Sequence, residues 1–244
     1  MVNSGLSSTA PATTRAACFE LAPGAGWRFR RWASQRVVAG MTDRSCEVAA
    51  ILSRLSGGVS TIEAEQVHGG SLAVVERLRA GSQPIAGCDA LLTNVPGVAL
   101  LVRSADCLPM FFADTVQQII GIAHVGWRGL AARLPQRVVA AFRHVYQSRA
   151  NALAVAIGPA IRHCCYEVGP EFAELFGSFV HERSGRRTCD LAGVAIDQLR
   201  RCGIAADRIL DAQRCTACDP QRWYSVRREG ESAGRLTSLI MLRA

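Results

Sequence analysis

Apolar and polar positions follow two periods along the chain, one typical of helices and one typical of strands. Apolar residues three and four apart predict helices at 43–55, 130–146, 170–179 and 191–202. Short apolar or alternating runs predict strands at 59–67, 72–75, 89–93, 98–103, 110–113, 118–124, 152–157, 209–212, 223–226 and 236–242. Hairpins mixed with helices in this order favour a single α/β domain in which a mixed β-sheet is flanked by helices, as α/β/α layers, rather than a regular doubly wound array.

The two ends of the chain differ in composition. Residues 1–17 are rich in Ser, Thr and Ala and lack an apolar core, so they predict a disordered N-terminus and not a signal peptide. No linker divides residues 18–244, which we interpret as one catalytic domain. The most apolar region, 90–113, is interrupted by polar residues and predicts no membrane span. We therefore expect a cytoplasmic protein.

The charged residues exclude several kinds of chemistry. The formal net charge is +8, and every basic residue is Arg, because the sequence contains no Lys. The chain therefore has no Lys for a Schiff base, a pyridoxal phosphate link or a Walker A loop. The arginines are scattered singly or in pairs without a long basic run, so we expect no nucleic acid partner.

Three short segments each place a His or a Cys after a predicted strand and beside a turn-forming residue. They contain His68 in Gln-Val-His-Gly, Cys107 in Ala-Asp-Cys-Leu-Pro and His124 in His-Val-Gly-Trp-Arg-Gly. Two imidazoles and one thiolate match the ligand set of a catalytic zinc site, which leaves one position open for water or substrate. The same residues also fit a thiol nucleophile, Cys107, with His124 as its base, or ordinary core and surface positions.

Two acidic residues and a tryptophan lie beside these segments. Asp106 precedes Cys107 and is a candidate general acid or base, or a group that orients His68 or His124. Asp89 begins a predicted strand and fits a cap or turn residue equally well. Trp127 can stack the flat ring of a ligand, which would be a purine if the family resemblance given below holds, although a buried position in the core is the commoner role of tryptophan.

Three arginines are candidate phosphate ligands. Arg227 and Arg228 follow a predicted strand end, and an Arg fork binds phosphate through two hydrogen bonds. Arg128 lies near a predicted helix start, where backbone amides also attract anions. Exposed charged turns are the alternative interpretation of these positions.

The chain has ten cysteines and no export signal, which favours free thiols in a reducing compartment. Cys215 and Cys218 form a Cys-x-x-Cys pair, a weak signal because a structural zinc needs two further ligands. Cys164 and Cys165 are the available candidates, but the sequence alone favours free structural thiols for all four.

From about residue 66 to residue 242 the chain resembles the YfiH-type family, long called laccase-domain or multicopper polyphenol oxidases and now interpreted as purine nucleoside phosphorylases. The resemblance rests on the three segments above and on Asp-Ala-Leu-Leu-Thr from 89, Pro-Gly-Val-Ala from 96, Gly-Pro-Ala-Ile from 158, Cys-Cys-Tyr-Glu-Val-Gly from 164, Cys-Thr-Ala-Cys from 215 and Ser-Val-Arg-Arg-Glu-Gly from 225. The front departs from the pattern: Thr-Thr-Arg at 13–15 is not followed by the usual Asn-Leu-Gly stretch, and 28–55 aligns loosely.

The resemblance implies that His68, Cys107 and His124 bind the metal. It implies a YfiH-like fold and zinc-dependent phosphorolysis of adenosine, inosine, guanosine and S-methyl-5'-thioadenosine, with adenosine deaminase activity. The partners would be purine nucleosides and phosphate. The protein itself would be a monomer or a homodimer. One alternative function is a copper-dependent polyphenol oxidase, which the presence of only five histidines disfavours. The other is a cysteine hydrolase that uses Cys107 and His124.

Overall fold

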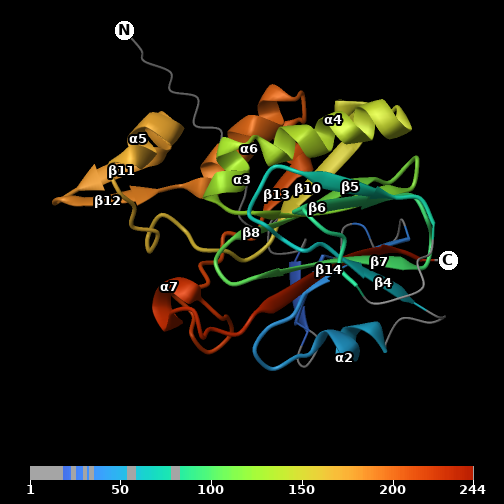
Figure 1. Cartoon of the computed structure of the whole chain (residues 1–244), viewed down its shortest axis with the longest axis horizontal. Coiled ribbons are helices and arrows are strands. Elements are labelled where there is room, and N and C mark those ends of the chain that lie inside the picture. The colour runs from blue at the N-terminus through green and yellow to red at the C-terminus, as the bar shows by residue number, and fades with distance from the viewer. Residues whose placement is uncertain are drawn as a thin grey trace, which may run out of the picture.

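The computed structural model describes residues 19–22, 26–29, 32, 36–53, 59–77 and 83–243. The predicted disordered segment 1–17 lies outside these residues. The described chain forms two six-stranded sheets that face each other, with helices on their outer faces (Figure 1). This arrangement confirms the expected α/β class with mixed strand directions, but it divides the strands between two sheets instead of one.

The first sheet joins the two ends of the described chain to its middle. Its order is β1-β2-β3-β14-β7-β4, in which only the β4–β7 pair is parallel. The strands are β1 (Phe19–Ala22), β2 (Gly26–Phe29), β3 (Val37–Met41), β14 (Leu236–Leu242), β7 (Val98–Ser104) and β4 (Ser60–Glu63).

The second sheet carries the longest buried strands. Its order is β13-β10-β8-β9-β6-β5, with parallel pairs at both edges and antiparallel pairs in the centre. The strands are β13 (Ile209–Asp211), β10 (Leu153–Ile157), β8 (Leu108–Asp114), β9 (Ile119–Val125), β6 (Ala90–Thr93) and β5 (Leu72–Val75). All positions of β8 and β9 are buried, because both faces of this sheet are covered, and such strands appear in sequence as continuous apolar runs.

Successive residues of β8 contact different layers of the core. Phe111 packs between the two sheets with Leu100 and Ile122, whereas Phe112 packs toward the helices, 6.3 Å from the ring of Phe142. This alternation is the strand period of two, and it ties the helical layer to the space between the sheets.

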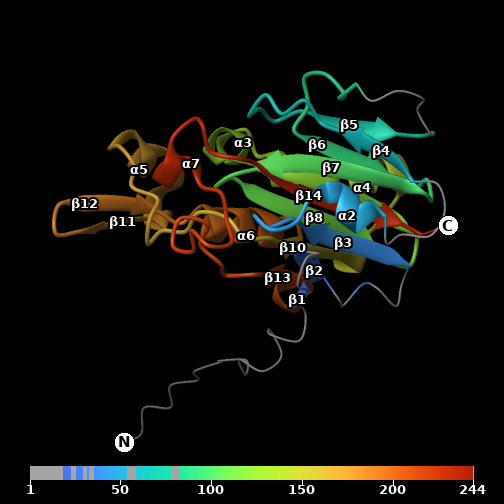
Figure 2. The ribbon, with the colours of Figure 1, turned by 90° about the horizontal axis from the view of Figure 1, so that it is seen from below.

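Helices cover both outer faces. The second sheet is covered by α3 (Trp127–Ala131), α4 (Leu134–Tyr146) and α6 (Leu191–Arg201), and α2 (Val48–Leu52) packs Ile51 against the first sheet. At one end of the sheets lie α5 (Glu171–Phe176), α7 (Val226–Glu229) and the hairpin of β11 (Val180–Arg183) and β12 (Arg186–Cys189), as Figures 1 and 2 both show. Within the described ranges, no helix is long and apolar enough to cross a lipid bilayer.

Two local predictions are wrong, and each has a physical reason. The predicted helix 130–146 is interrupted, because Arg133 takes a left-handed conformation (φ 57°) and Pro135, which lacks an N–H donor, lies in the first turn of α4. The predicted strand 223–226 is instead the approach to α7, because the hydroxyl of Ser225 accepts a hydrogen bond from the amide of Arg228 and caps that helix. Arg227 and Arg228 therefore lie in a helix and not at a strand end.

Candidate metal centre and active-site cavity

His68, Cys107 and His124 come together at one end of the sheets. His68 lies in the loop between β4 and β5, Cys107 immediately precedes β8, and His124 lies in β9, where it pairs with Pro109 of β8. One donor atom from each of the three side chains lies within 4.8 Å of the other two. The two imidazole rings are nearly perpendicular, with centroids 4.8 Å apart. The three residues that the sequence analysis selected thus form one cluster.

Asp89 holds this cluster in place through hydrogen bonds. Its carboxylate is fully buried, and Oδ1 lies 3.0 Å from Nδ1 of His124. The same carboxylate accepts hydrogen bonds from the backbone amides of His68 (2.9 Å) and Gly69 (2.7 Å). Metal-bound histidines commonly donate their second ring N–H to a carboxylate in this way, which leaves Nε2 of His124 for a metal. The cap-or-turn interpretation of Asp89 missed this role, because its three partners are 20, 21 and 35 residues away in the sequence.

The cluster is electrostatically coupled. Burial alone would raise the pKa of the Cys107 thiol, but hydrogen bonds from His124 and His68 outweigh it and lower the pKa to about 6. Burial would lower the pKa of His124, but the hydrogen bonds that its imidazole donates to Asp89 and Cys107 raise it to about 9. Burial would likewise raise the pKa of Asp89, but its bonds from His124 and Gly69 hold it below the usual value. These shifts favour a thiolate at Cys107, the form in which cysteine binds metals.

The backbone around the cluster is held in unusual conformations. Gln66 and His68 have positive φ values of 66° and 57°, which non-glycine residues rarely adopt. The side-chain amide of Gln66 holds this loop by pairing with the backbone of Arg103, accepting from its N–H at 2.7 Å and donating to its C=O at 2.5 Å. A Cβ atom at Gly126 would lie 3.0 Å from Sγ of Cys107, so a side chain at this position would crowd the thiol.

A cavity of about 890 Å³ opens directly onto the three donor residues. Its walls come from the β4–β5 loop, the turn before β8, and helices α3 and α7, which lie at the same end of the sheets (Figure 1). Its volume suits a small-molecule ligand. The aromatic side chains of Trp127 and Tyr166 contribute to the wall, and Trp127 also packs on Phe172 with ring centroids 5.3 Å apart.

The candidate arginines differ in what they contact. Arg128 lines the cavity and lies over the ring of Trp127, 4.5 Å from its centroid. Arg227 also lines the cavity, donates to the carbonyl of Glu167 at 2.8 Å and lies over the ring of Tyr166. Two further arginines in the wall, Arg103 and Arg235, were not among the phosphate candidates of the sequence analysis.

Arg228 lies outside the set of residues that line this cavity. Its guanidinium donates to the backbone carbonyls of Thr216 (2.8 Å), Ala217 (2.9 Å) and Trp223 (2.6 Å), and to the carboxylate of Glu229. The guanidinium of Arg228, which the sequence analysis proposed as a phosphate ligand, is thus already bonded to carbonyl and carboxylate oxygens of the protein.

Asp106 lines the cavity, and its carboxylate accepts three hydrogen bonds from other parts of the chain. Its carboxylate accepts from the hydroxyls of Thr216 (2.6 Å) and Ser225 (3.0 Å) and from the backbone amide of Arg227 (2.7 Å). Among the described residues, it has no hydrogen bond to either imidazole of the cluster. The orienting role that the sequence analysis considered for Asp106 belongs to Asp89, whereas Asp106 connects the Cys107 turn (φ 98° at Asp106) to the start of α7.

The fold and this site define a class of protein: a two-sheet α/β chain with a His-Cys-His cluster at the base of an arginine-lined cavity. Residues 25–243 match the family model described as "Multi-copper polyphenol oxidoreductase laccase". The chain belongs to this family, which confirms the resemblance seen in the sequence.

Named relatives and a solved structure agree with this assignment. The chain is 35% identical over 169 residues to a purine nucleoside phosphorylase of Aquifex aeolicus (69% of this chain, 78% of the relative). It is 30% identical over 185 residues to adenosine deaminase RL5 of an unknown prokaryotic organism (70% of each chain). The fold matches the crystal structure of YlmD from Geobacillus stearothermophilus with a TM-score of 0.83 and 25% identity, over 93% of this chain and 99% of YlmD.

Proposed function

We propose that this chain is a zinc-dependent purine nucleoside phosphorylase that also deaminates adenosine. Its substrates would be adenosine, inosine, guanosine and S-methyl-5'-thioadenosine. The observation that carries the proposal is that the His68–Cys107–His124 cluster and the guanidinium groups of Arg128 and Arg227 face the same cavity. The relatives named as purine nucleoside phosphorylase and adenosine deaminase support both reactions.

The residues of the cluster fit a zinc ion. A thiolate and two imidazoles are donors that zinc prefers, and Asp89 holds His124 in the orientation that a ligating imidazole needs. Gly126 keeps the space beside the thiol free of a side chain. Bound there, zinc would supply Lewis-acid charge that activates water for attack on C6 of adenine.

Copper is the alternative metal that the family description suggests. Multicopper oxidases hold several copper ions with many histidines, whereas this chain has five histidines in total. In the described part of the chain, the histidines take part in one metal-type cluster, that of His68 and His124. This ligand supply favours a single zinc ion over a multicopper centre.

The cavity wall offers what phosphorolysis requires. Arg128 and Arg227 would bind phosphate through charge-assisted hydrogen bonds and hold it toward C1′ of the ribose. Trp127 and Tyr166 offer apolar ring surface for the purine. Asp106 and Arg228 would act as positioning residues, because each fixes α7 and thereby Arg227.

The direct test is turnover of inosine with phosphate by the purified, zinc-loaded protein. We expect hypoxanthine and ribose 1-phosphate in equal amounts, and inosine from adenosine when phosphate is left out. A protein that contains zinc but turns over no purine nucleoside would contradict the proposal.

His124→Gln tests whether one centre serves both reactions. Glutamine keeps a polar side chain but is a poor zinc ligand, so adenosine deamination should be lost and phosphorolysis should fall with it. Circular dichroism of the variant would verify that it is folded. Phosphorolysis at the full rate would show that the metal serves only the hydrolytic reaction.

A further inference from the structure

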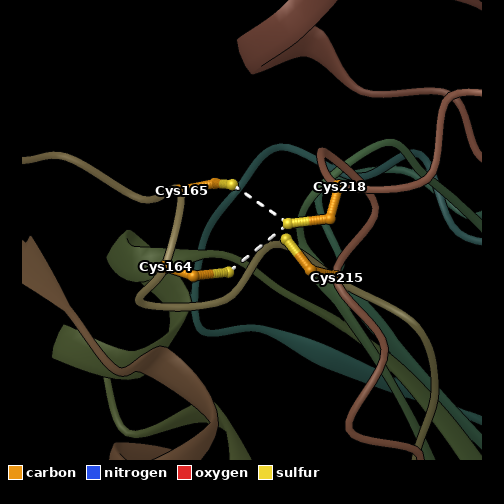
Figure 3. A group of neighbouring side chains, drawn as sticks. All are labelled: Cys164, Cys165, Cys215 and Cys218. Carbon is orange, nitrogen blue, oxygen red and sulfur yellow. Dashed lines mark hydrogen bonds between the residues drawn. The ribbon is translucent and has the colours of Figure 1, made fainter.

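Four cysteines from two separate loops meet outside the cavity. Cys164 and Cys165 lie in the loop between β10 and α5, and Cys215 and Cys218 lie in the loop between β13 and α7. Figure 3 shows the side chains of the first pair pointing across toward the second pair. All four sulfur atoms lie within 4.8 Å of one another. The sequence favoured unrelated free thiols here because the two pairs are about fifty residues apart.

The spacing of the sulfurs matches a metal tetrahedron. Sγ of Cys218 lies 3.6 Å from Sγ of Cys164 and 3.4 Å from Sγ of Cys165. Four sulfurs bound tetrahedrally to zinc at about 2.3 Å are separated by roughly 3.8 Å. A disulfide would bring two sulfurs to about 2.05 Å, and all four of these cysteines are free.

The local backbone surrounds one corner of the cluster. Backbone amides of Arg162 and Cys218 form hydrogen bonds with the sulfur of Cys215. The second of these bonds runs within the Cys-Thr-Ala-Cys turn, so the turn folds around its own first sulfur. Such a turn presents two sulfurs on one side, which is how Cys-x-x-Cys segments hold zinc.

We propose that Cys164, Cys165, Cys215 and Cys218 form a structural zinc site. Four thiolates from two loops close the coordination shell and leave no position for substrate or water. The site is separate from the His68–Cys107–His124 cluster, and its existence does not depend on the proposed catalytic activity.

The zinc would clamp together two loops that shape the active-site cavity. The loops already touch at one bridge, where Ala160 donates to Arg214 and accepts from Thr216. From this bridge, the amide of Ile161 donates to the carbonyl of Asp106, and the hydroxyl of Thr216 donates to its carboxylate. The metal therefore holds the two loops that fix the turn carrying Cys107.

The test counts zinc in the full chain and in two variants purified under reducing conditions. We expect about two zinc ions per wild-type chain and about one in each of Cys107→Ala and Cys218→Ser, since each variant loses one site. Cys202→Ser is the matched control: its partly buried thiol lies outside both clusters, so the variant should keep both ions.

X-ray absorption at the zinc edge of Cys107→Ala gives a second measurement, which does not require that Cys218→Ser folds. The expected shell is four sulfurs at about 2.3 Å without nitrogen. Three results would overturn the proposal: no metal in Cys107→Ala, iron in place of zinc, or disulfides among these cysteines in the mass spectrum of protein purified in the same way. A wild-type chain with one zinc in an all-sulfur shell would support this site and contradict the catalytic one.

Discussion

The buried carboxylate of Asp89 joins the two histidines of the cluster through a single oxygen: Oδ1 lies 3.0 Å from Nδ1 of His124 and accepts the backbone N–H of His68 at 2.9 Å. Asp89 comes immediately before β6, which lies beside β9 in the second sheet. The position of one side chain in the sheet thus sets the orientation of one candidate ligand and the backbone of another.

Replacing Asp89 by Asn should weaken metal binding by about 10- to 100-fold, because the amide cannot hold the imidazole and two backbone donors as a carboxylate does. Zinc affinity measured by competition with a chelator checks this. Asp114→Asn is the matched control, since Asp114 is an equally buried carboxylate that accepts from Ser148. The control should lose about 1–3 kcal/mol of stability but keep its zinc affinity. Equal zinc affinities in the two variants would show that Asp89 does not act on the metal.

Gln66→Ala should loosen the His68 loop, because it removes both hydrogen bonds to the backbone of Arg103. We expect faster zinc release and a stability loss of about 1–2 kcal/mol. Gln147→Ala serves as the control: Gln147 also has a positive φ (58°) and donates to one backbone carbonyl, but it ends α4. Zinc release as slow as in the wild type would mean that the loop is held by other contacts.

Arg227 and Arg228 are adjacent in sequence but should respond differently to substitution. Arg227→Gln should raise the KM for phosphate by about tenfold or more and affect deamination less, because only phosphorolysis uses phosphate. Arg228→Gln should lower the melting temperature and reduce both activities together, because it removes three hydrogen bonds from the guanidinium to backbone carbonyls. A phosphate-specific defect in a fully stable Arg228→Gln protein would reverse these assignments.

Asp106 can be tested through its partner. If Asp106 positions the turn before β8, Thr216→Val should reproduce the defects of Asp106→Asn, since it removes the 2.6 Å hydrogen bond without touching the carboxylate. Both variants should lose stability, by about 1–3 kcal/mol, and both reactions should slow without a change in the shape of their pH profiles. If Asp106 transfers protons itself, Asp106→Asn will abolish turnover while Thr216→Val leaves it near the wild-type rate.

The sequence predicted well those long strands that are buried on both faces. Predicted strand 236–242 coincides with β14, and 118–124 differs from β9 by one residue at each end, because continuous apolar runs identify such strands without knowledge of their neighbours. Strands β11 and β12 were missed, because their hairpin is mostly exposed and its arginines and glutamates show no apolar alternation. The division into two sheets depends on pairings such as β7 with β14, which join positions more than 130 residues apart.

The residue types pointed to three candidate ligands that the fold brings into one cluster. They did not reveal which residues surround this cluster. Asp89 and Gln66 act through partners distant in sequence, so their roles depend on the fold. Arg228 looked equivalent to Arg227 because sequence does not show that α7 begins at 226 and turns one guanidinium toward carbonyls. The sequence likewise did not show that the two cysteine pairs meet. Their loops lie together because strands β10 and β13, which precede them, pair in parallel.

The pairing of Pro109 with His124 places two of the three candidate ligands on a single hairpin, β8–β9, with sixteen residues between Cys107 and His124. This hairpin can form early in folding, because its contacts are local. His68 reaches it only when β6 has paired with β9, β5 has paired with β6, and Asp89 has formed its hydrogen bonds to both histidines. A partly folded chain can therefore offer two ligands to a metal ion. The full metal affinity arises only when the sheet is complete. Tight retention of the metal would thus indicate that the chain has folded correctly.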